Sequence, residues 1–180
     1  MPLGTQLACY NGFHNGVLRN NMPTKSLDRI DRKILEALQA DGRLTNQDLA
    51  ARVSLSPSPC LRRVRALEEA GVIRQYVALL EPRKVGLGLC AYVTVKLEKK
   101  GKMPIDQFTR SVQAWPEVVA CYSMTGDMDY LMRVQVADLD HYSRFVMDKL
   151  LKQPGVLDVK SNFVLERIKD TTEIPLEHLS

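Results

Sequence analysis

With 180 residues and a net charge of +4, the chain is long enough for one ordinary domain or two small ones with modest cores. No apolar run approaches the length of a membrane span, and the N-terminus lacks the continuous apolar core of a signal peptide. We therefore expect a cytoplasmic protein without a membrane partner.

The charge is unevenly distributed along the chain. Residues 22–90 carry 12 Lys and Arg against 8 Asp and Glu, whereas residues 91–180 carry 12 against 13. This favours two domains, with the positive field on the first, as a nucleic-acid partner requires.

The four cysteines are scattered without the spacing of metal ligands: Cys9, Cys60, Cys90 and Cys121. We expect reduced thiols and no metal site. Cys60 falls on the apolar side of a predicted helix, so we interpret it as a packed small hydrophobe; redox sensing is the alternative.

Residues 1–21 are rich in Asn and Gly and show neither helical nor strand periodicity. They predict a poorly ordered extension. Met22 with the three residues after it resembles a second, natural start, which leaves open whether residues 1–21 come from an expression vector or from an upstream initiation codon.

The first predicted element is an amphipathic helix over about residues 26–40. Asp28 and Asp31 near its start suit the helix dipole, and Asp41-Gly42 ends it. The prediction depends on apolar residues that recur at helical spacing: Leu27, Ile30, Ile34, Leu35 and Leu38.

Residues 44–65 predict two short helices joined by a tight turn. Thr45 can cap the first helix, and Asp48 can answer the cap from inside. Ser56 repeats the cap for the second helix, with Pro57 at the first helical position. Two short helices so joined are typical of a helix-turn-helix.

The second helix of this pair has two different faces. The apolar face carries Cys60, Leu61, Val64 and Leu67. The opposite face carries small and charged residues, namely Ser58, Pro59, Arg62, Ala66 and Glu69, and Arg63 and Arg65 flank it. The arginines alone are equally compatible with a solvated face. Small residues at the start let the helix approach a groove, where arginines reach phosphates or guanine edges. The predicted DNA-binding residues are Thr45, Ser56, Ser58, Pro59, Arg62, Arg63 and Arg65.

Residues 72–80 have the β-branched and aromatic content of a strand, which indicates a winged helix-turn-helix or a connector. The predicted domains are a helix-turn-helix domain over 22–80, a linker over 81–89, a second domain over 90–170 and a tail over 171–180.

The second domain has the predicted order β-α-β-β-α-β, which is the split βαβ or ferredoxin-like fold of an α+β protein. Its strands are expected over residues 89–97, 118–125, 130–136 and 156–168, and its helices over 104–114 and 138–150. Both helices of such a fold cover one face of the sheet, so a second copy of the chain is the simplest cover for the other face. That face carries Tyr92, Thr94, Tyr122, Arg133 and Gln135.

Four segments in this order resemble the Lrp/AsnC family of bacterial and archaeal transcription regulators, over about residues 27–175. They are LDRIDRKIL at 27–35, LSPSPCLRRV at 55–64, LEEAGVI at 67–73 and GDMDY at 126–130. The resemblance implies a sequence-specific regulator that binds double-stranded promoter DNA, responds to a small amino acid and is not an enzyme.

The resemblance also implies that the second domain senses amino acids, dimerises through its sheet and assembles into an octamer as a tetramer of dimers. In the family the effector lies between dimers beside the Gly-Asp-x-Asp-Tyr loop. The effector-binding residues carried over are Ser123, Met124, Thr125, Gly126, Asp127, Met128, Asp129, Tyr130, Leu139, Asn162, Phe163 and Val164. A plain turn would also use Gly126 for a positive φ and Asp127 as a cap, but it would not need a second acid at Asp129.

The identity of the effector stays open in the sequence. Met124, Met128 and Phe163 would suit an apolar or sulfur side chain, and residues 170–176 resemble a tail of family branches that respond to cysteine or control branched-chain degradation. The candidates are leucine or another branched-chain amino acid, methionine and cysteine. The promoters bound, and the choice between activation and repression, also stay open.

Two other functions compete with this interpretation. Ferredoxin-like domains also serve as regulatory or catalytic units of amino-acid metabolism. Against catalysis, the sequence has no phosphate loop and no nucleophile elbow, and its three histidines are dispersed. The other alternative is an architectural protein that wraps DNA with little sequence choice, which footprinting at one promoter against bulk DNA would distinguish.

Overall fold

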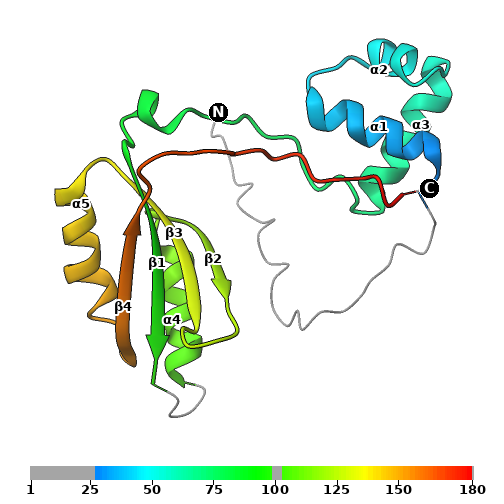
Figure 1. Ribbon diagram of the computed structural model, residues 1–180. Helices are drawn as coiled ribbons and strands as arrows, with labels where there is room; N and C mark the ends of the chain where they lie inside the picture. The colour runs from blue at the N-terminus through cyan, green and yellow to red at the C-terminus, as the bar shows by residue number, and fades with distance from the viewer. Residues whose placement is uncertain (1–26, 99–102, 180) are drawn as a thin grey trace, which may run out of the picture. The chain divides into compact units, whose positions relative to one another are not determined.

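The computed structural model describes residues 27–98 and 103–179 and divides them into two compact units (Figure 1). One unit combines the chain up to Val77 with the residues from Thr171 onward, and the other comprises Ala78–Asp170. The C-terminal residues thus belong to the helical unit. The predicted extension over residues 1–21 lies outside the described residues.

The helical unit begins with α1, Arg29–Ala40, whose start is fixed by the predicted acids. The Asp28 carboxylate accepts hydrogen bonds from the amides of Ile30 and Asp31, at 2.9 and 2.8 Å. The Asp31 carboxylate accepts one from the Asp28 amide at 3.3 Å, which completes a capping box. Ile34 of α1 is fully buried in the core of this unit.

The helix-turn-helix consists of α2, Asn46–Arg52, and α3, Pro57–Glu69. Thr45 caps α2 as predicted, but Ser56 makes no side-chain cap at α3, so that prediction was wrong. An N-cap side chain bonds the amide of the second or third helical residue, and the third residue here is Pro59, which has no N–H.

Residues 72–80 do not form the predicted strand. They are extended but carry no ladder, and a 3-10 turn, η1 (Pro82–Val85), follows them. Val77, Leu79 and Leu80 are between 63% and 72% exposed. The composition is that of a strand, but a strand also needs a neighbouring strand to pair with, and no strand within residues 27–98 and 103–179 pairs with this segment.

The second unit is a four-stranded antiparallel sheet with the order β2-β3-β1-β4. Its strands are β1 (Leu89–Leu97), β2 (Val118–Ser123), β3 (Tyr130–Val136) and β4 (Val156–Phe163), and its helices are α4 (Met103–Ala114) and α5 (Leu139–Arg144), which continues as a π-helical segment to Leu150. The predicted ferredoxin-like order is confirmed. The last strand ends at Phe163, five residues earlier than predicted, because β1 begins at Leu89 and leaves only two residues beyond the Ala91–Phe163 pair. One further bond follows this pair, from the Val164 amide to the Cys90 carbonyl at 3.0 Å.

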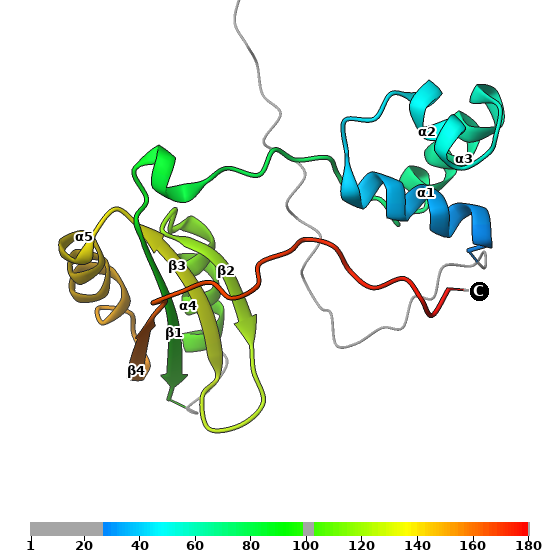
Figure 2. The same ribbon diagram turned by 45° about the horizontal axis from the view of Figure 1, so that its top comes forward.

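Both helices of this unit cover the same face of the sheet, as Figure 2 shows. Phe108 of α4 and Phe145, the first residue of the π-helical segment after α5, are each 1% exposed and share one core with Val93, Val95 and Met132 of the strands. The opposite face is the predicted one and carries Tyr92, which pairs with Arg133 across the ladder, and Tyr122. Two tyrosines thus lie exposed on a face that no helix of this unit covers.

Candidate functional sites

The outward side of α3 forms a shallow, open hollow. Leu61, predicted to face inward, is 38% exposed and lies in it. Of the predicted DNA-binding residues, Ser58, Arg62 and Arg65 line the hollow, together with Ala66 and Glu69. A helix that presents two exposed guanidinium groups behind a small serine has the shape and charge to enter a groove lined with phosphates.

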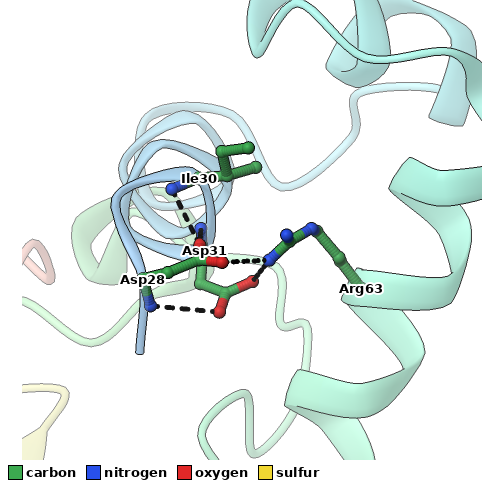
Figure 3. A network of polar contacts seen from close by, with 4 residues as sticks. All are labelled: Asp28, Ile30, Asp31 and Arg63. Carbon is green, nitrogen blue, oxygen red and sulfur yellow. Dashed lines mark hydrogen bonds and ion pairs between the residues drawn. The ribbon is translucent and has the colours of Figure 1, made fainter. Parts of the chain in front are cut away.

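Arg63 is one residue from Arg62 but points back into its own protein. Its Nη1 lies 2.7 Å from Asp28 Oδ2 and 2.8 Å from Asp31 Oδ1, at the start of α1 (Figure 3). The Asp31 side chain is only 8% exposed, whereas those of Arg63 and Asp28 are 30% and 51% exposed, so Asp31 is the nearly buried member of the network. Arg63 therefore joins α3 to α1 and sets the orientation of α3, and its charge is already neutralised.

The same network shifts the pKa values of its members. The hydrogen bond from the Asp31 amide, with a further contribution from Arg63, lowers the pKa of the Asp28 carboxyl below its usual 3.8. Hydrogen bonds to Asp31 and Asp28 raise the pKa of the Arg63 guanidinium further above its ordinary value. Both shifts favour the charged forms, so the network is an ion pair in the folded state.

The other predicted DNA-binding residues lie at the ends of α2 and α3. The Thr45 hydroxyl is engaged within the helix cap, since it accepts from the Asp48 amide at 3.2 Å and donates to Asp48 Oδ2 at 2.6 Å. Ser56 is exposed and Pro59 is half-buried. A contact that was not predicted involves Asn46, whose Nδ2 donates to the carbonyl of Pro57 at 2.9 Å and joins α2 to the start of α3.

In the second unit, the loop between β2 and β3 is held against β1 by Asp129. The Asp129 carboxylate accepts from the Leu97 amide at 2.7 Å, and the Asp129 amide donates to the carbonyl of Val95 at 3.0 Å. Asp129, the second acid of this loop, therefore has a structural role, because it fixes the loop to β1. Gly126 has a φ of 115°, which only glycine adopts readily.

Between these anchors, part of the loop is open to ligands. Ser123, Met124, Thr125, Gly126 and Asp127 are exposed. The Tyr130 ring points the other way and packs on Phe108, with 4.9 Å between the ring centroids, and burial raises the pKa of its hydroxyl. The exposed edge offers backbone groups, two hydroxyls and one carboxylate to a small polar ligand.

Four of the predicted effector residues, Leu139 and residues 162–164, lie at the opposite end of the sheet. Along β1, Val95 pairs with Tyr130 near the loop, whereas Ala91 pairs with Phe163 at the far end. Leu139 follows β3 at that far end too, and Asn162 and Val164 flank Phe163. One chain therefore does not bring them together with the loop. The Phe163 ring instead packs edge to face on Tyr142, with centroids 5.0 Å apart.

A buried carboxylate that the sequence did not indicate lies before β2. Glu117 is 8% exposed, and its Oε1 lies 2.6 Å from Lys149 Nζ and 3.6 Å from His141 Nε2. Burial alone raises the pKa of Glu117, but the bond from Lys149 outweighs it with the help of other hydrogen bonds, so the net pKa is lowered. This pair ties the second helix of the unit to the edge of the sheet.

The thiols of Cys60 and Cys121 are not poised for reaction. Cys60 is fully buried, as its predicted packing role requires, and burial raises the pKa of its thiol. Burial also raises the pKa of Cys121 to about 11. Within residues 27–98 and 103–179, no group of three metal-binding side chains comes together, and no helix is long and apolar enough to cross a membrane.

Comparison with known proteins gives both units a counterpart. Residues 27–74 match a family described as winged helix-turn-helix DNA-binding, and residues 90–174 match one described as the Lrp/AsnC ligand binding domain. The leucine-responsive regulatory protein of Escherichia coli is 41% identical over 155 residues, which cover 86% of this chain and 94% of that protein.

Solved structures show the same likeness. A transcriptional regulator from Neisseria meningitidis, solved as a complex with L-Met, is 51% identical with a TM-score of 0.84, covering 86% of this chain and all of that one. An AsnC family regulator from Agrobacterium tumefaciens is 44% identical with a TM-score of 0.80, covering 85% of this chain and 99% of that one.

Proposed function

The chain belongs to the Lrp/AsnC family of DNA-binding transcription regulators, and from this premise we propose which residues bind promoter DNA and the effector. The exposed face of α3 reads DNA through Ser58, Arg62 and Arg65. The exposed edge of the β2–β3 loop binds a small amino acid. The proposed activity is binding alone, in the cytoplasm, with no catalytic step.

The DNA-binding proposal depends on the different contacts that the three arginines of α3 make. Arg62 and Arg65 line the open hollow, and neither takes part in a salt bridge among residues 27–98 and 103–179. Arg63 is bonded to α1. Arg62 and Arg65 thus retain their hydrogen-bond donors for phosphates or guanine edges, and Arg63 acts as a positioning residue.

Fluorescence anisotropy with a promoter fragment selected by the wild-type chain tests this proposal. We expect log K to fall by about 0.9 per phosphate contact as log salt rises. Arg62→Ala should weaken binding at least about fivefold, the effect of about 1 kcal/mol from a lost base contact. Arg29→Ala removes an exposed arginine from α1 and serves as the control. Equal affinity of wild type and Arg62→Ala, or equal affinity for promoter and bulk DNA, would contradict sequence-specific reading by α3.

For the effector, we propose an amino acid with an apolar or sulfur side chain, with methionine and leucine foremost. The support comes from relatives: the meningococcal structure is a complex with L-Met, and the Escherichia coli relative is named leucine-responsive. Met124 adds a soft apolar surface beside the loop. Because Leu139 and residues 162–164 lie at the far end of the sheet, they take part only if a second copy brings its far end to this loop.

A thermal-shift screen across the amino acids tests the effector proposal. A ligand that binds only the folded state raises stability by RT ln(1+[L]/Kd), about 2.7 kcal/mol at a hundredfold excess over Kd. Asp127→Asn should reduce this shift and leave the ligand-free protein as stable as before, because Asp127 is exposed. Asp129→Asn should lower the stability of the ligand-free protein too, since Asp129 anchors the loop. A full shift in Asp127→Asn would remove this residue from the site.

We further propose that the uncovered sheet face pairs two copies into a dimer and that dimers assemble into an octamer. The support is the exposure of Tyr92 and Tyr122, at 40% and 58%, on the face opposite the helices. A dimer places two copies of α3 on one DNA, so repeated half-sites are expected in the promoter.

A further inference from the structure

The C-terminal segment, Thr171–Leu179, is packed onto the helical unit. Leu176 is only 8% exposed and belongs to the same apolar core as Ile34 and Leu35 of α1. Leu179 packs partly against that core. Both views of the chain show the end of this segment beside α1 (Figures 1 and 2). The core of the helical unit is therefore completed by residues from the far end of the sequence.

Polar side chains of α1 bind the backbone of this segment at two places. The Gln39 amide acts as a clip: its Oε1 accepts from the Ile174 amide at 2.8 Å, and its Nε2 donates to the Ile174 carbonyl at 3.1 Å. Arg32 Nη1 donates to the carbonyl of Leu179 at 3.2 Å and approaches that of Glu177 at 3.5 Å. These bonds satisfy an extended backbone much as a neighbouring strand would.

The C-terminal segment follows a connector, residues 164–170, that leaves the end of β4. β4 lies next to β1, and β1 is the strand that the linker from the helical unit enters. β1 begins at Leu89, directly after the linker, and β4 ends at Phe163, directly before the C-terminal connector. The two strands are hydrogen-bonded neighbours, with Ala91 opposite Phe163. Both connections to the helical unit thus leave the same end of the sheet from adjacent strands.

We propose that α1 carries a docking surface for the chain's own C-terminal segment and that the docked segment is a second tether between the ligand-binding and DNA-binding units. With one linker, the DNA-binding unit could rotate freely about a single connecting segment of the chain. With two, its motion is restrained, and a change at the end of the sheet acts on it through both connections. The proposal depends on the packing and connectivity of this chain, and it requires neither an identified effector nor an identified promoter.

Hydrogen exchange of the full-length chain tests the docking. Leu176→Asp places a charge in the apolar core, and Ile174→Asp makes the same change two residues away at a side chain that is 66% exposed. We expect amides of residues 172–179 to exchange at least tenfold faster in Leu176→Asp and at the wild-type rate in Ile174→Asp. Gln39→Ala, with Lys33→Ala on the same helix as its control, gives the same contrast without touching the core. Wild-type exchange in both Leu176→Asp and Gln39→Ala would overturn the docking.

Small-angle X-ray scattering on the same variants tests the tether. Released segments should raise the radius of gyration in Leu176→Asp and Gln39→Ala at unchanged oligomer mass, with Ile174→Asp and Lys33→Ala unchanged. If exchange shows release but the radius of gyration stays at the wild-type value, the segment is a structural patch and the tether is refuted. A fall in oligomer mass on release would show that the segment docks onto a second copy, which would also overturn the proposal.

Discussion

At the scale of single residues, neighbouring arginines of α3 have different roles because of what each side chain meets. Arg62 lines an open hollow, whereas Arg63 lies between two carboxylates at the start of α1. A charge that is already paired within its own protein contributes little to binding a phosphate. When such a charge is removed, the acid that it paired with stays buried, and the cost of that acid's desolvation is no longer compensated. Stability and DNA affinity should therefore separate between the two positions.

Arg63→Ala should lower the free energy of unfolding by about 1–3 kcal/mol, because the nearly buried Asp31 carboxylate loses its charged partner and keeps only the bond from the Asp28 amide. Arg62→Ala, on an exposed side chain, should leave stability within about 0.5 kcal/mol of wild type. Urea titrations of both variants measure the difference. Equal stability of the two variants would contradict the structural role assigned to Arg63.

Asp28 makes the helical unit sensitive to acid. Its pKa in the folded state lies below its usual 3.8, mainly because of the hydrogen bond from the Asp31 amide. A depressed pKa contributes stability that is present above the unfolded value and is lost as pH falls through the folded value. Part of the stability should therefore disappear below about pH 4.

Asp28→Asn isolates this charge effect, since asparagine caps a helix nearly as well as aspartate. We expect the variant to lose less unfolding free energy than wild type between about pH 6 and about pH 3. Urea titrations at several pH values measure this. Parallel stability profiles for the two proteins would exclude a contribution from the Asp28 charge.

At the scale of elements, the turn between α2 and α3 contains a local conflict. Ser54 has a φ of 58°, a left-handed conformation that costs a residue with a Cβ about 1–2 kcal/mol. This conformation closes the end of α2, where the Ser54 amide donates to the Ala51 carbonyl at 3.3 Å and the Leu55 amide to the Ala50 carbonyl at 2.9 Å, the two bonds of a Schellman motif. The sequence offers no glycine at this position to relieve the strain.

Ser54→Gly should therefore raise the unfolding free energy by about 0.5–1 kcal/mol, the relief of left-handed strain less the added chain entropy of glycine. Ala51→Gly, inside α2, is the matched control and should lower it by a similar amount. Thermal or urea unfolding distinguishes the two signs. A destabilised Ser54→Gly protein would show that the turn carries no strain.

At the scale of the whole molecule, the distribution of exposed apolar side chains points to surfaces that one copy leaves uncovered. The uncovered sheet face presents Tyr92 and Tyr122, and the connector after α3 exposes Val77, Leu79 and Leu80. Apolar surface of this kind, flanked by polar groups, marks association sites in regulators that assemble.

Tyr122→Arg should lower the fraction of the protein that is dimeric. The new charge lies within the proposed interface, near the like charge of Arg133 on the adjacent strand. Met147→Arg makes the same charge change at a side chain that is 60% exposed on the π-helical segment, on the helix-covered side of the sheet. Light scattering coupled to size exclusion should give a lower mass for the first variant alone. A wild-type mass for Tyr122→Arg would place the interface elsewhere.

Much of the fold was predictable because its signals are local. The helical spacing from Leu27 to Leu38, the Thr45 cap and the strand alternation of residues 89–97 all depend on residues close in sequence, and each element formed. The ends of elements were less predictable where a distant partner decides them. In the described part of the chain no strand pairs with residues 72–80, and β4 ends near the point where β1 begins.

The sequence by itself determined two units, a helix-turn-helix with arginines on its second helix and a βαββαβ domain with a Gly-Asp-x-Asp-Tyr loop. Only the tertiary structure decided what the individual side chains meet. In the folded chain Arg63 forms an ion pair with Asp28 at the start of α1, and the Asp129 carboxylate accepts a hydrogen bond from the Leu97 amide. Leu176 packs in a core formed by residues from the other end of the sequence. Periodicity reports which face of an element is apolar, but contacts between residues far apart in sequence arise only when the elements pack.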